Sequence, residues 1–279
     1  MSESAPRPQA RVGISGWVYP AWRRTFYPKG LRQADELGYA AARMTSIEIN
    51  GSFYALQRPA SWHRWRDATP DGFVFAVKGP RFITHIKRLG DVDAPLANFF
   101  ASGVLELGAK LGPILWQLPP TLAYDEALLA GFLERLPRTR QAAARLAAAH
   151  DERMEGRSAF AVEEDAPLRH SVEVRHPSFD EAEEEWAGLL ARHGVASVVA
   201  DTAGRYPRID RTTSDFAYAR LHGDEELYVS GYEEAALDRW AAWASAHLDA
   251  GRDAYLYFDN DAKVRAPVDA MALIARLRG

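Results

Sequence analysis

The sequence contains no cysteine and very little lysine. The absence of cysteine excludes disulfide bridges, zinc sites with cysteine ligands, iron–sulfur clusters and thiol nucleophiles. Arginine carries almost all of the basic charge, because lysine occurs only at positions 29, 78, 87, 110 and 263. A lysine that falls at the end of a predicted strand, as Lys78 does, therefore stands out.

The chain also lacks an excess of basic charge and long apolar runs. Its 34 Lys and Arg against 38 Asp and Glu give a formal net charge of −4, so we expect neither a nucleic acid nor an anionic membrane as partner. No run approaches 18 consecutive apolar residues, and Met1 to Ala10 lack the apolar core of a signal peptide. We expect a cytoplasmic protein in which residues 1–10 form a disordered lead. The oligomeric state stays open.

Short β-branched or aromatic runs alternate with helical patterns along the whole chain of 279 residues. This alternation predicts parallel βαβ units and, with eight strands, a (β/α)8 TIM-type barrel over residues 11–279. An open doubly wound sheet is the alternative, but no G-x-G-x-x-G turn follows the first strand to support a dinucleotide site. The predicted strands are Val12–Ser15, Ser46–Asn50, Phe73–Lys78, Ile114–Leu118, Ser171–Arg175, Ala196–Asp201, Phe216–His222 and Ala254–Phe258.

The helical patterns lie between these strands, and 202–214 has the character of a loop. One stretch, 139–169, interrupts the rhythm with an Ala/Arg-rich helical segment and a polar loop, which we interpret as an insertion before strand five of a single domain. The predicted helices are Leu31–Arg43, Pro59–Ala68, Ala94–Leu111 with Asp93 as its N-cap, Asp125–Leu136, Asp180–Arg192, Tyr232–Asp249 and one after Pro267.

In such a barrel the functional residues lie at the carboxyl ends of the strands, on side chains that face inward. Side chains two positions apart share a face, so the apolar positions of each strand are assigned to the helices and the polar ones to the mouth. In Ala196–Asp201 this places Val198 outside and Asp201 inside. The polar side chains predicted at the mouth are Glu48, Asn50, Lys78, Gln117, Glu173, Arg175, Asp201, Arg220, His222 and Asn260. Trp17 and Tyr54, which follow strands one and two, supply aromatic walls.

Seven motifs, in order along almost the whole chain, resemble those of the YecE-like family, a domain of unknown function. They are GISGWVYPAW at 13–22, SIEINGSFY at 46–54, FAVKGPRFITH at 75–85, WQLPP at 116–120, HSVEVRHPSF at 170–179, ARLHG at 219–223 and YLYFDND at 255–261. The resemblance implies a TIM-type barrel with shared polar residues at its mouth, but no reaction. The family-motif positions that it implies are Glu48, Asn50, Lys78, His85, Gln117, Glu173, Arg175, His176, Arg220, His222 and Asn260. One departure, FDN at 258–260, sets Asp259 apart from them.

Several of these residues have two interpretations. Glu173 and Arg175 form either an internal ion pair or an acid/base group beside an anion clamp. Glu48 either orients Lys78 or is a catalytic carboxylate, and His222 is a catalytic candidate as well. His85 and His176 are expected chiefly as hydrogen-bonding loop residues beside the substrate.

Three functions remain open on the sequence. The first is an enzyme without metal or cofactor that acts on a small anionic or phosphorylated, sugar-like molecule, held by Lys78, Arg175 and Arg220. Its proton-transfer groups are Glu48 or Glu173 with His222. The second is a divalent-metal isomerase or phosphodiesterase that uses Glu48, Glu173, Asp201 and His222, although no H-x-H or H-E-x-x-H spacing is present. The third is a non-catalytic module that binds a metabolite or a protein.

Overall fold

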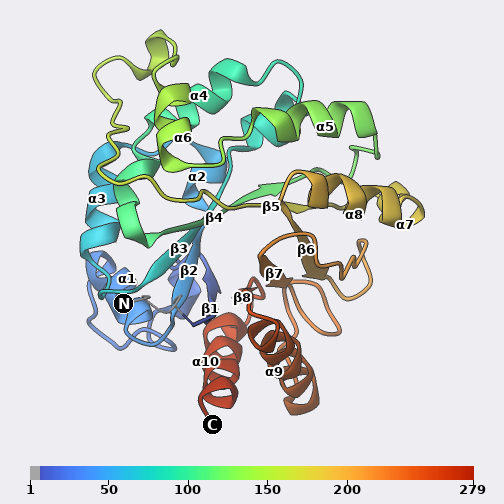
Figure 1. The fold of residues 1–279 in the computed structure, drawn as a ribbon. Helices are drawn as coiled ribbons and strands as arrows, with labels where there is room; N and C mark the ends of the chain where they lie inside the picture. The colour runs from blue at the N-terminus through green and yellow to red at the C-terminus, as the bar shows by residue number, and fades with distance from the viewer. Residues whose placement is uncertain (1–6) are drawn as a thin grey trace, which may run out of the picture.

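The computed structural model describes residues 7–279 and shows a closed barrel of eight parallel strands in sequence order (Figure 1). All eight predicted strands and the (β/α)8 fold are confirmed. The strands are β1 (Ala10–Ser15), β2 (Ser46–Ile49), β3 (Val74–Lys78), β4 (Leu111–Gln117), β5 (His170–Glu173), β6 (Ala196–Asp201), β7 (Phe216–Leu221) and β8 (Asp253–Phe258). Because β1 starts at Ala10, the expected lead 1–10 extends too far; its residues 1–6 lie outside the described residues.

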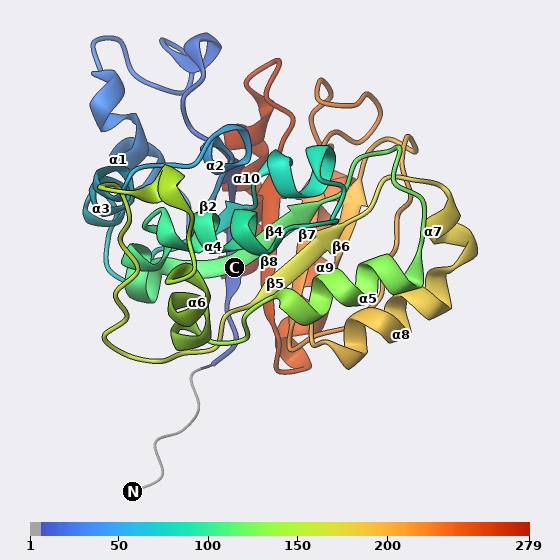
Figure 2. The same cartoon turned by 90° about the horizontal axis from the view of Figure 1, so that it is seen from above.

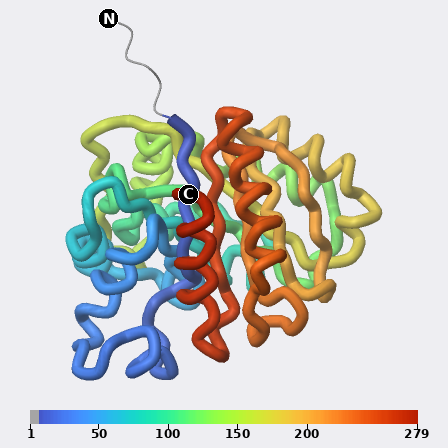
Figure 3. Tube along the Cα trace, turned by 90° about the horizontal axis from the view of Figure 1, so that it is seen from below, coloured from blue at the N-terminus to red at the C-terminus, as the bar shows by residue number. Residues whose placement is uncertain are grey.

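Helices surround the barrel, and Figure 2 shows the outer layer around the strands. The last helix lies beside β1 and next to the helix before it, so it covers the junction that closes the barrel (Figure 3). The helices are α1 (Glu36–Ala41), α2 (Gly51–Tyr54), α3 (Pro59–Asp67), α4 (Asp93–Ala101), α5 (Glu126–Arg135), α6 (Arg140–Ala147), α7 (Ser178–Glu181), α8 (Glu183–Arg192), α9 (Glu234–Asp249) and α10 (Arg265–Arg278).

Some predicted helices are divided in the structure. The single helix expected over 94–111 is wrong, because Gly103 adopts a φ of 103° and separates α4 from a 3-10 segment, Val104–Lys110. A Cβ at Gly103 would lie 2.8 Å from the side chain of Trp62, so the break also permits a close approach of α3. Val92, rather than Asp93, occupies the N-cap of α4.

Two other helices are shorter than predicted. The segment 31–43 forms a 3-10 turn, Gln33–Asp35, followed by α1. The segment 180–192 is divided into α7 and α8 at Ala182. The connection from residue 202 to residue 214 contains no helix, as expected.

The insertion 139–169 forms α6, a 3-10 turn at Glu152–Met154 and a long loop. Its helix packs against α4 through the buried Ala143 and Ala147. The backbone N–H of Asp151 donates to Oδ1 of Asn98 on α4 at 3.0 Å. The insertion therefore extends the outer helical layer beside the β3–α4 side of the barrel.

The barrel interior is apolar and aromatic below its polar mouth. The interior cluster consists of Val74, Ala76, Leu115, Ala196, Val198, Phe216, Tyr218, Tyr255 and Tyr257. Val198 thus faces inward and Val199 packs with the outer core, so the predicted facing of β6 is wrong. Both faces of this strand carry aliphatic side chains, and their alternation does not distinguish inside from outside.

Between residues 7 and 279 no helix combines the length and apolar character needed to cross a membrane.

Candidate functional site

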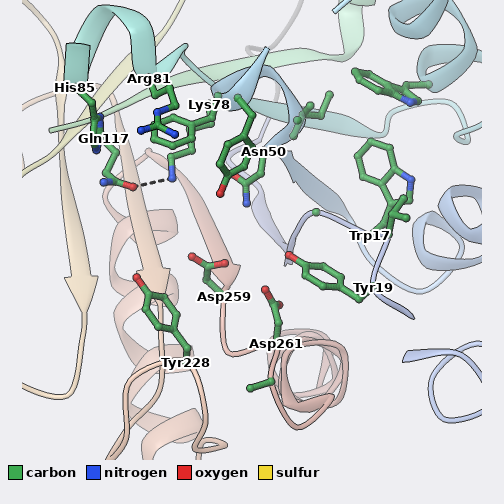
Figure 4. Close-up of a pocket in the computed structure, with 18 of the residues that line it drawn as sticks. Trp17, Tyr19, Asn50, Lys78, Arg81, His85, Gln117, Tyr228, Asp259 and Asp261 are labelled. Atoms are coloured by element: carbon green, nitrogen blue, oxygen red, sulfur yellow. Dashed lines mark hydrogen bonds between the residues drawn. The ribbon is translucent and has the colours of Figure 1, made fainter. Parts of the chain in front are cut away.

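A cavity of about 890 Å³ opens at the carboxyl ends of the strands (Figure 4). Its size is in the range of small-molecule sites. The residues around it come from the ends of β1, β2, β3, β4, β5 and β8, from the loops that follow these strands and β7, and from α3. They are Gly16, Trp17, Val18, Tyr19, Ile49, Asn50, Gly51, Phe53, Tyr54, Trp65, Lys78, Arg81, His85, Gln117, Arg175, Tyr228, Asp259, Asp261 and Ala262.

A fully buried arginine, Arg220 on β7, lies beneath this cavity and joins three carboxylates. Its Nε and Nη2 donate to the two oxygens of Glu48 at 3.1 and 2.9 Å. Its Nη1 donates to Glu173 at 2.7 Å, and Nη2 also donates to Asp259 at 2.8 Å. All of its nitrogens are therefore committed to carboxylates, and Arg220 organises the site rather than holding a ligand.

Glu48 and Glu173 have no accessible surface. Glu48 also accepts hydrogen bonds from Ser15 at 2.9 Å and from the Tyr218 hydroxyl at 2.7 Å, so each of its oxygens has two donors. Burial alone would raise the pKa of Glu173, but the charges of Arg175 and Arg220 outweigh it and hold that pKa well below its usual range. Glu173 is therefore a fixed negative charge beneath the cavity, and Glu48 is held beside Arg220 by four hydrogen bonds.

Arg175 connects this buried layer to the cavity. Its Nε donates to Oε1 of Glu173 at 2.8 Å, and the ring of Tyr206 lies 4.8 Å from its guanidinium carbon. Within residues 7–279, Nη1 and Nη2 of Arg175 make no hydrogen bond. The structure thus contains the internal ion pair of Glu173 and Arg175, and it leaves these two nitrogens available to a ligand. The anion clamp stays a prediction.

Lys78, at the end of β3, is buried yet reaches the cavity. Its Nζ donates to Oε1 of Gln117 at 2.7 Å and lies 4.3 Å from the centre of the Phe53 ring (Figure 4). Burial and the repulsion of Arg220 lower the pKa of Lys78 to about 8, against the attraction of the nearby carboxylates. With Arg81 and Arg175 it forms the cationic wall of the cavity.

Two carboxyl groups, Asp259 and Asp261, face the cationic wall from the segment after β8 and form the acidic wall (Figure 4). Burial alone would raise the pKa of Asp259, but Arg220 and His222 outweigh it and lower that pKa to about 2. Burial and the negative charge of Asp259 raise the pKa of Asp261 to about 8. Oδ1 of Asp261 is buried and, within the described part of the chain, accepts no hydrogen bond. The pKa values of the two carboxyl groups of the acidic wall are therefore shifted in opposite directions.

The histidines differ in their relation to the cavity. His222 is fully buried, with Nδ1 3.1 Å from Oδ2 of Asp259, and it contacts two cavity residues, Asp259 and Tyr228, without lining the cavity itself. His85 lines the cavity, and burial together with Lys78 and Arg81 lowers its pKa to about 4. His176 does not line the cavity; its Nδ1 lies 2.9 Å from the Ser178 hydroxyl.

Aromatic side chains complete the walls. Trp17 and Trp65 meet edge to face with their ring centres 5.3 Å apart, and Tyr54 is 71% exposed at the rim. Tyr19 donates its hydroxyl to the backbone oxygen of Ser15. Tyr228 closes the cavity above His222, with ring centres 5.4 Å apart. A ligand in the cavity would thus meet apolar ring surfaces between the two charged walls.

The structure brings most of the predicted residues together, at two levels. Trp17, Asn50, Tyr54, Lys78, His85, Gln117 and Arg175 line the cavity. Glu48, Glu173, Arg220 and His222 lie buried. Asp259 lines the cavity, accepts a hydrogen bond from the buried Arg220 and lies 3.1 Å from the buried His222, so it connects the buried residues to the cavity.

Asp201 and Asn260 are corrections. Asp201 lies on the helix-facing side of β6, where its Oδ2 accepts the hydroxyl of Tyr232 at 3.2 Å. Asn260 is buried and its Nδ2 donates to Asp269 on α10 and to the backbone oxygen of Ser230, both at 2.9 Å. Neither side chain lines the mouth, contrary to the sequence prediction.

Sequence reasoning missed Asp259, Asp261, Tyr19, Arg81 and Tyr228 as cavity residues. Asp259 had a signal, because it follows the inward-facing Tyr255 and Tyr257 at a spacing of two. The others lie in loops, where no periodicity indicates direction. Trp65, expected only to pack on α3, also lines the cavity.

The cluster of Glu48, Glu173, Asp201 and His222 that the alternative metal-dependent function needs is not assembled. Arg220 occupies the space between Glu48 and Glu173, and Asp201 lies on the other side of its strand. Among residues 7–279 no three His, Asp or Glu side chains are grouped so that they could hold a metal ion.

A second hollow, of about 580 Å³, adjoins the first and shares Phe53, Tyr54 and Arg81 with it. It lies between the segment after β3 and the insertion, which contributes Arg153 and Arg157. The mouth therefore continues toward the insertion.

The chain is similar to several known proteins. A family described as "Protein of unknown function DUF72" matches residues 11–279. The UPF0759 protein YecE of Escherichia coli K12 is 29% identical over 195 residues, 68% of this chain and 58% of that protein. The chain thus spans less than two thirds of this relative's length.

Two solved structures share the fold. A DUF72 family protein from Thermotoga maritima MSB8 has a TM-score of 0.77 and 26% identity, and the match covers 97% of this chain and 100% of that one. A DUF72 family protein from Enterococcus faecalis V583 has a TM-score of 0.74 at 14% identity, covering 97% and 96%. The second likeness concerns the fold alone.

Proposed function

The chain belongs to the DUF72 family, and we propose that it binds a small anionic, phosphorylated or sugar-like molecule at the barrel mouth and catalyses acid–base chemistry on it. The observation that carries the proposal is the arrangement of the cavity. A cationic wall with uncommitted N–H groups faces an acidic wall whose two carboxyl groups differ in protonation. Groups with such divergent pKa values are suited to act as an acid and a base.

The cationic wall supports binding of an anion. Arg175 has two nitrogens free for a planar fork on a carboxylate or phosphate, and Lys78 and Arg81 add positive charge beside it. The sequence predicts Arg220 as a third anion-binding group. In the structure Arg220 instead binds Glu173, which in turn binds Arg175, and it also binds Asp259.

The acidic wall supports proton transfer. The neutral carboxyl of Asp261 is a proton donor at pH 7, and the ionised Asp259 is an acceptor that His222 and Arg220 orient. Glu48 and Glu173 are thereby assigned as positioning residues rather than the acid and base, because both are fully buried and both oxygens of each are bonded to donors, chiefly arginine.

Thermal unfolding in the presence of phosphate, sulfate and a panel of sugar phosphates tests this function. A ligand at about 100 times its Kd adds roughly 2.7 kcal/mol, which shifts Tm by several degrees. We expect phosphorylated compounds to raise Tm in the wild type and in Arg192→Gln, a surface variant on α8, but not in Arg175→Gln. Equal shifts in all three proteins, or no shift with any anion, would contradict the proposal. A fall in Tm with EDTA that one divalent metal restores would favour the metal-dependent alternative.

A further inference from the structure

Lys78 differs from the other buried cations of the site in what it is bonded to. Arg220 contacts three carboxylates and Arg175 contacts one. The Nζ of Lys78 instead donates to a neutral amide, Gln117, and among residues 7–279 it has no carboxylate partner within salt-bridge distance. The arginines have taken the available negative charge, so the burial of this ammonium group is not compensated by an ion pair.

The surroundings of Lys78 increase the fraction of its neutral amine. The side chain is 8% exposed, Arg175 and Arg81 line the same cavity, and Arg220 lies beneath it. Burial and the repulsion of Arg220 outweigh the attraction of Glu173, Glu48 and Asp259, which, like the Phe53 ring 4.3 Å from Nζ, favours the charged form. With its pKa at about 8, about a tenth of the Lys78 side chains are neutral at pH 7, against about one in 3,000 for an ordinary lysine. Lysines desolvated beside other cations are activated nucleophiles.

We propose that Lys78 is a nucleophile that forms an imine with a carbonyl carbon of the ligand, which is therefore an aldehyde or ketone bearing an anionic group. This inference rests on the proposed function for the anionic group and for the proton donor. The free N–H positions of Arg175 hold the anion, and the carbonyl then lies between the cationic wall and the acidic wall.

The chemistry balances with groups that line the cavity. The neutral Nζ attacks the carbonyl carbon, a proton moves from nitrogen to oxygen, and a carbinolamine results. Asp261 then gives its proton to the departing hydroxyl, which leaves as water, and the product is a protonated imine opposite an Asp261 carboxylate. No oxidant or reductant is consumed. The cation formed on Nζ is stabilised by the acidic wall that it faces (Figure 4).

Gln117 fixes the direction of the attack. Its Oε1 holds one hydrogen of Nζ at a donor–acceptor distance of 2.7 Å from the neighbouring strand β4. The Nζ atom itself ends at the cavity (Figure 4). By contrast Lys110, the other lysine with several contacts, donates to the backbone oxygens of Arg66 and Thr69 away from the mouth.

The test is reductive trapping on the full chain. Wild-type protein is incubated at pH 7 with sodium borohydride and either dihydroxyacetone phosphate or dihydroxyacetone, and the modified lysines are mapped by peptide mass spectrometry. The exposed Lys29 and Lys263 are internal references in the same sample. We expect Lys78 to be labelled at least tenfold faster than either reference. We also expect dihydroxyacetone phosphate to label Lys78 at lower concentrations than dihydroxyacetone does. In Lys78→Met, whose fold is checked by circular dichroism, labelling of the references is unchanged and no preferred site remains.

The pair of probes separates the two proposals. Rapid labelling of Lys78 by both probes at equal concentrations would support the amine and contradict the anion site. Stabilisation of the protein by dihydroxyacetone phosphate without labelling of Lys78 above the references would retain the anion site and overturn the imine. Labelling at the reference rate with neither probe binding would overturn both. Because the wild-type map is decisive, a failure of Lys78→Met to fold leaves the conclusion intact.

Discussion

Arg220 holds Glu48 with two guanidinium nitrogens, Nε at 3.1 Å from Oε2 and Nη2 at 2.9 Å from Oε1, and neither side chain is exposed to solvent. The same guanidinium reaches Glu173 and Asp259. A buried charge is tolerated when it is paired and hydrogen-bonded, so this cluster forms the rigid floor on which the ligand-facing groups stand.

Removing Arg220 should destabilise the fold strongly. Arg220→Met leaves three carboxylates without their shared cation, and we expect the free energy of unfolding to fall by about 3–5 kcal/mol. The matched control is Arg192→Gln, because Arg192 pairs with Glu126 at the surface and its loss should cost less than about 1 kcal/mol. Urea unfolding measures both. A loss in Arg220→Met as small as in the control would contradict the role of the cluster.

Asp259 and Asp261 should affect the pH dependence of stability in opposite directions. The folded-state pKa of Asp259, about 2, lies below the usual aspartate pKa of 3.8, so its stabilisation is present above pH 3.8 and is lost as pH falls toward 2. Asp259→Asn should therefore flatten the acid limb of the stability curve. Unfolding free energies measured by urea titration between pH 2 and pH 4 check this, and an unchanged slope would refute it.

For Asp261 the sign is reversed. Its folded-state pKa of about 8 lies above 3.8, so the folded state binds more protons than the unfolded state and stability falls as pH rises from 4 to 8. Asp261→Asn removes this loss, and we expect the variant to be more stable than the wild type at pH 8 by about 1 kcal/mol or more. The difference should disappear near pH 4; a constant difference across this range would be inconsistent with a buried neutral acid.

Lys78→Met should also be more stable than the wild type at pH 7. The wild type keeps Lys78 mostly charged in a buried site at this pH, and the apolar side chain removes that cost, by about 1 kcal/mol or more. Between pH 8 and 10.5 the unfolded state holds more protons, so wild-type stability rises and the gap narrows. Chemical unfolding at pH 7 and pH 10 measures the gap. If Lys78→Met were less stable than the wild type at pH 7, and the difference in unfolding free energy were the same at pH 10, the uncompensated burial of the Lys78 ammonium group would be contradicted.

The inner position of Glu48 and Arg220 follows from alternation, because the charged side chain of each strand lies opposite a face of aliphatic side chains. On β3 both faces are apolar, and only Lys78 at the strand end indicates which face is inside. On β6 both faces are aliphatic, so the polar end of the strand suggested an inward direction for Asp201 that the structure does not have. On β8 the inward-facing Tyr255 and Tyr257 set the alternation, and extending it two residues further places Asp259 inside and Asn260 outside.

The remaining differences come from loops and from buried pairing. Tyr19, Arg81 and Tyr228 reach the cavity from irregular segments, where backbone direction depends on tertiary contacts. The sequence also shows which charges share the mouth but not which of them pair. Because Arg220 pairs with three carboxylates, Glu48 and Glu173 position other groups, and Lys78 donates its hydrogen bond to Gln117 rather than to a carboxylate.

The central claim is that the mouth binds an anion through Arg175. Isothermal titration calorimetry with dihydroxyacetone phosphate on wild type, Arg175→Gln and Arg192→Gln tests it most directly. We predict one site per chain in the wild type and in Arg192→Gln, and affinity at least tenfold weaker in Arg175→Gln, which loses the planar fork. Binding of equal strength in Arg175→Gln, or heat of binding in none of the three proteins, would contradict the account.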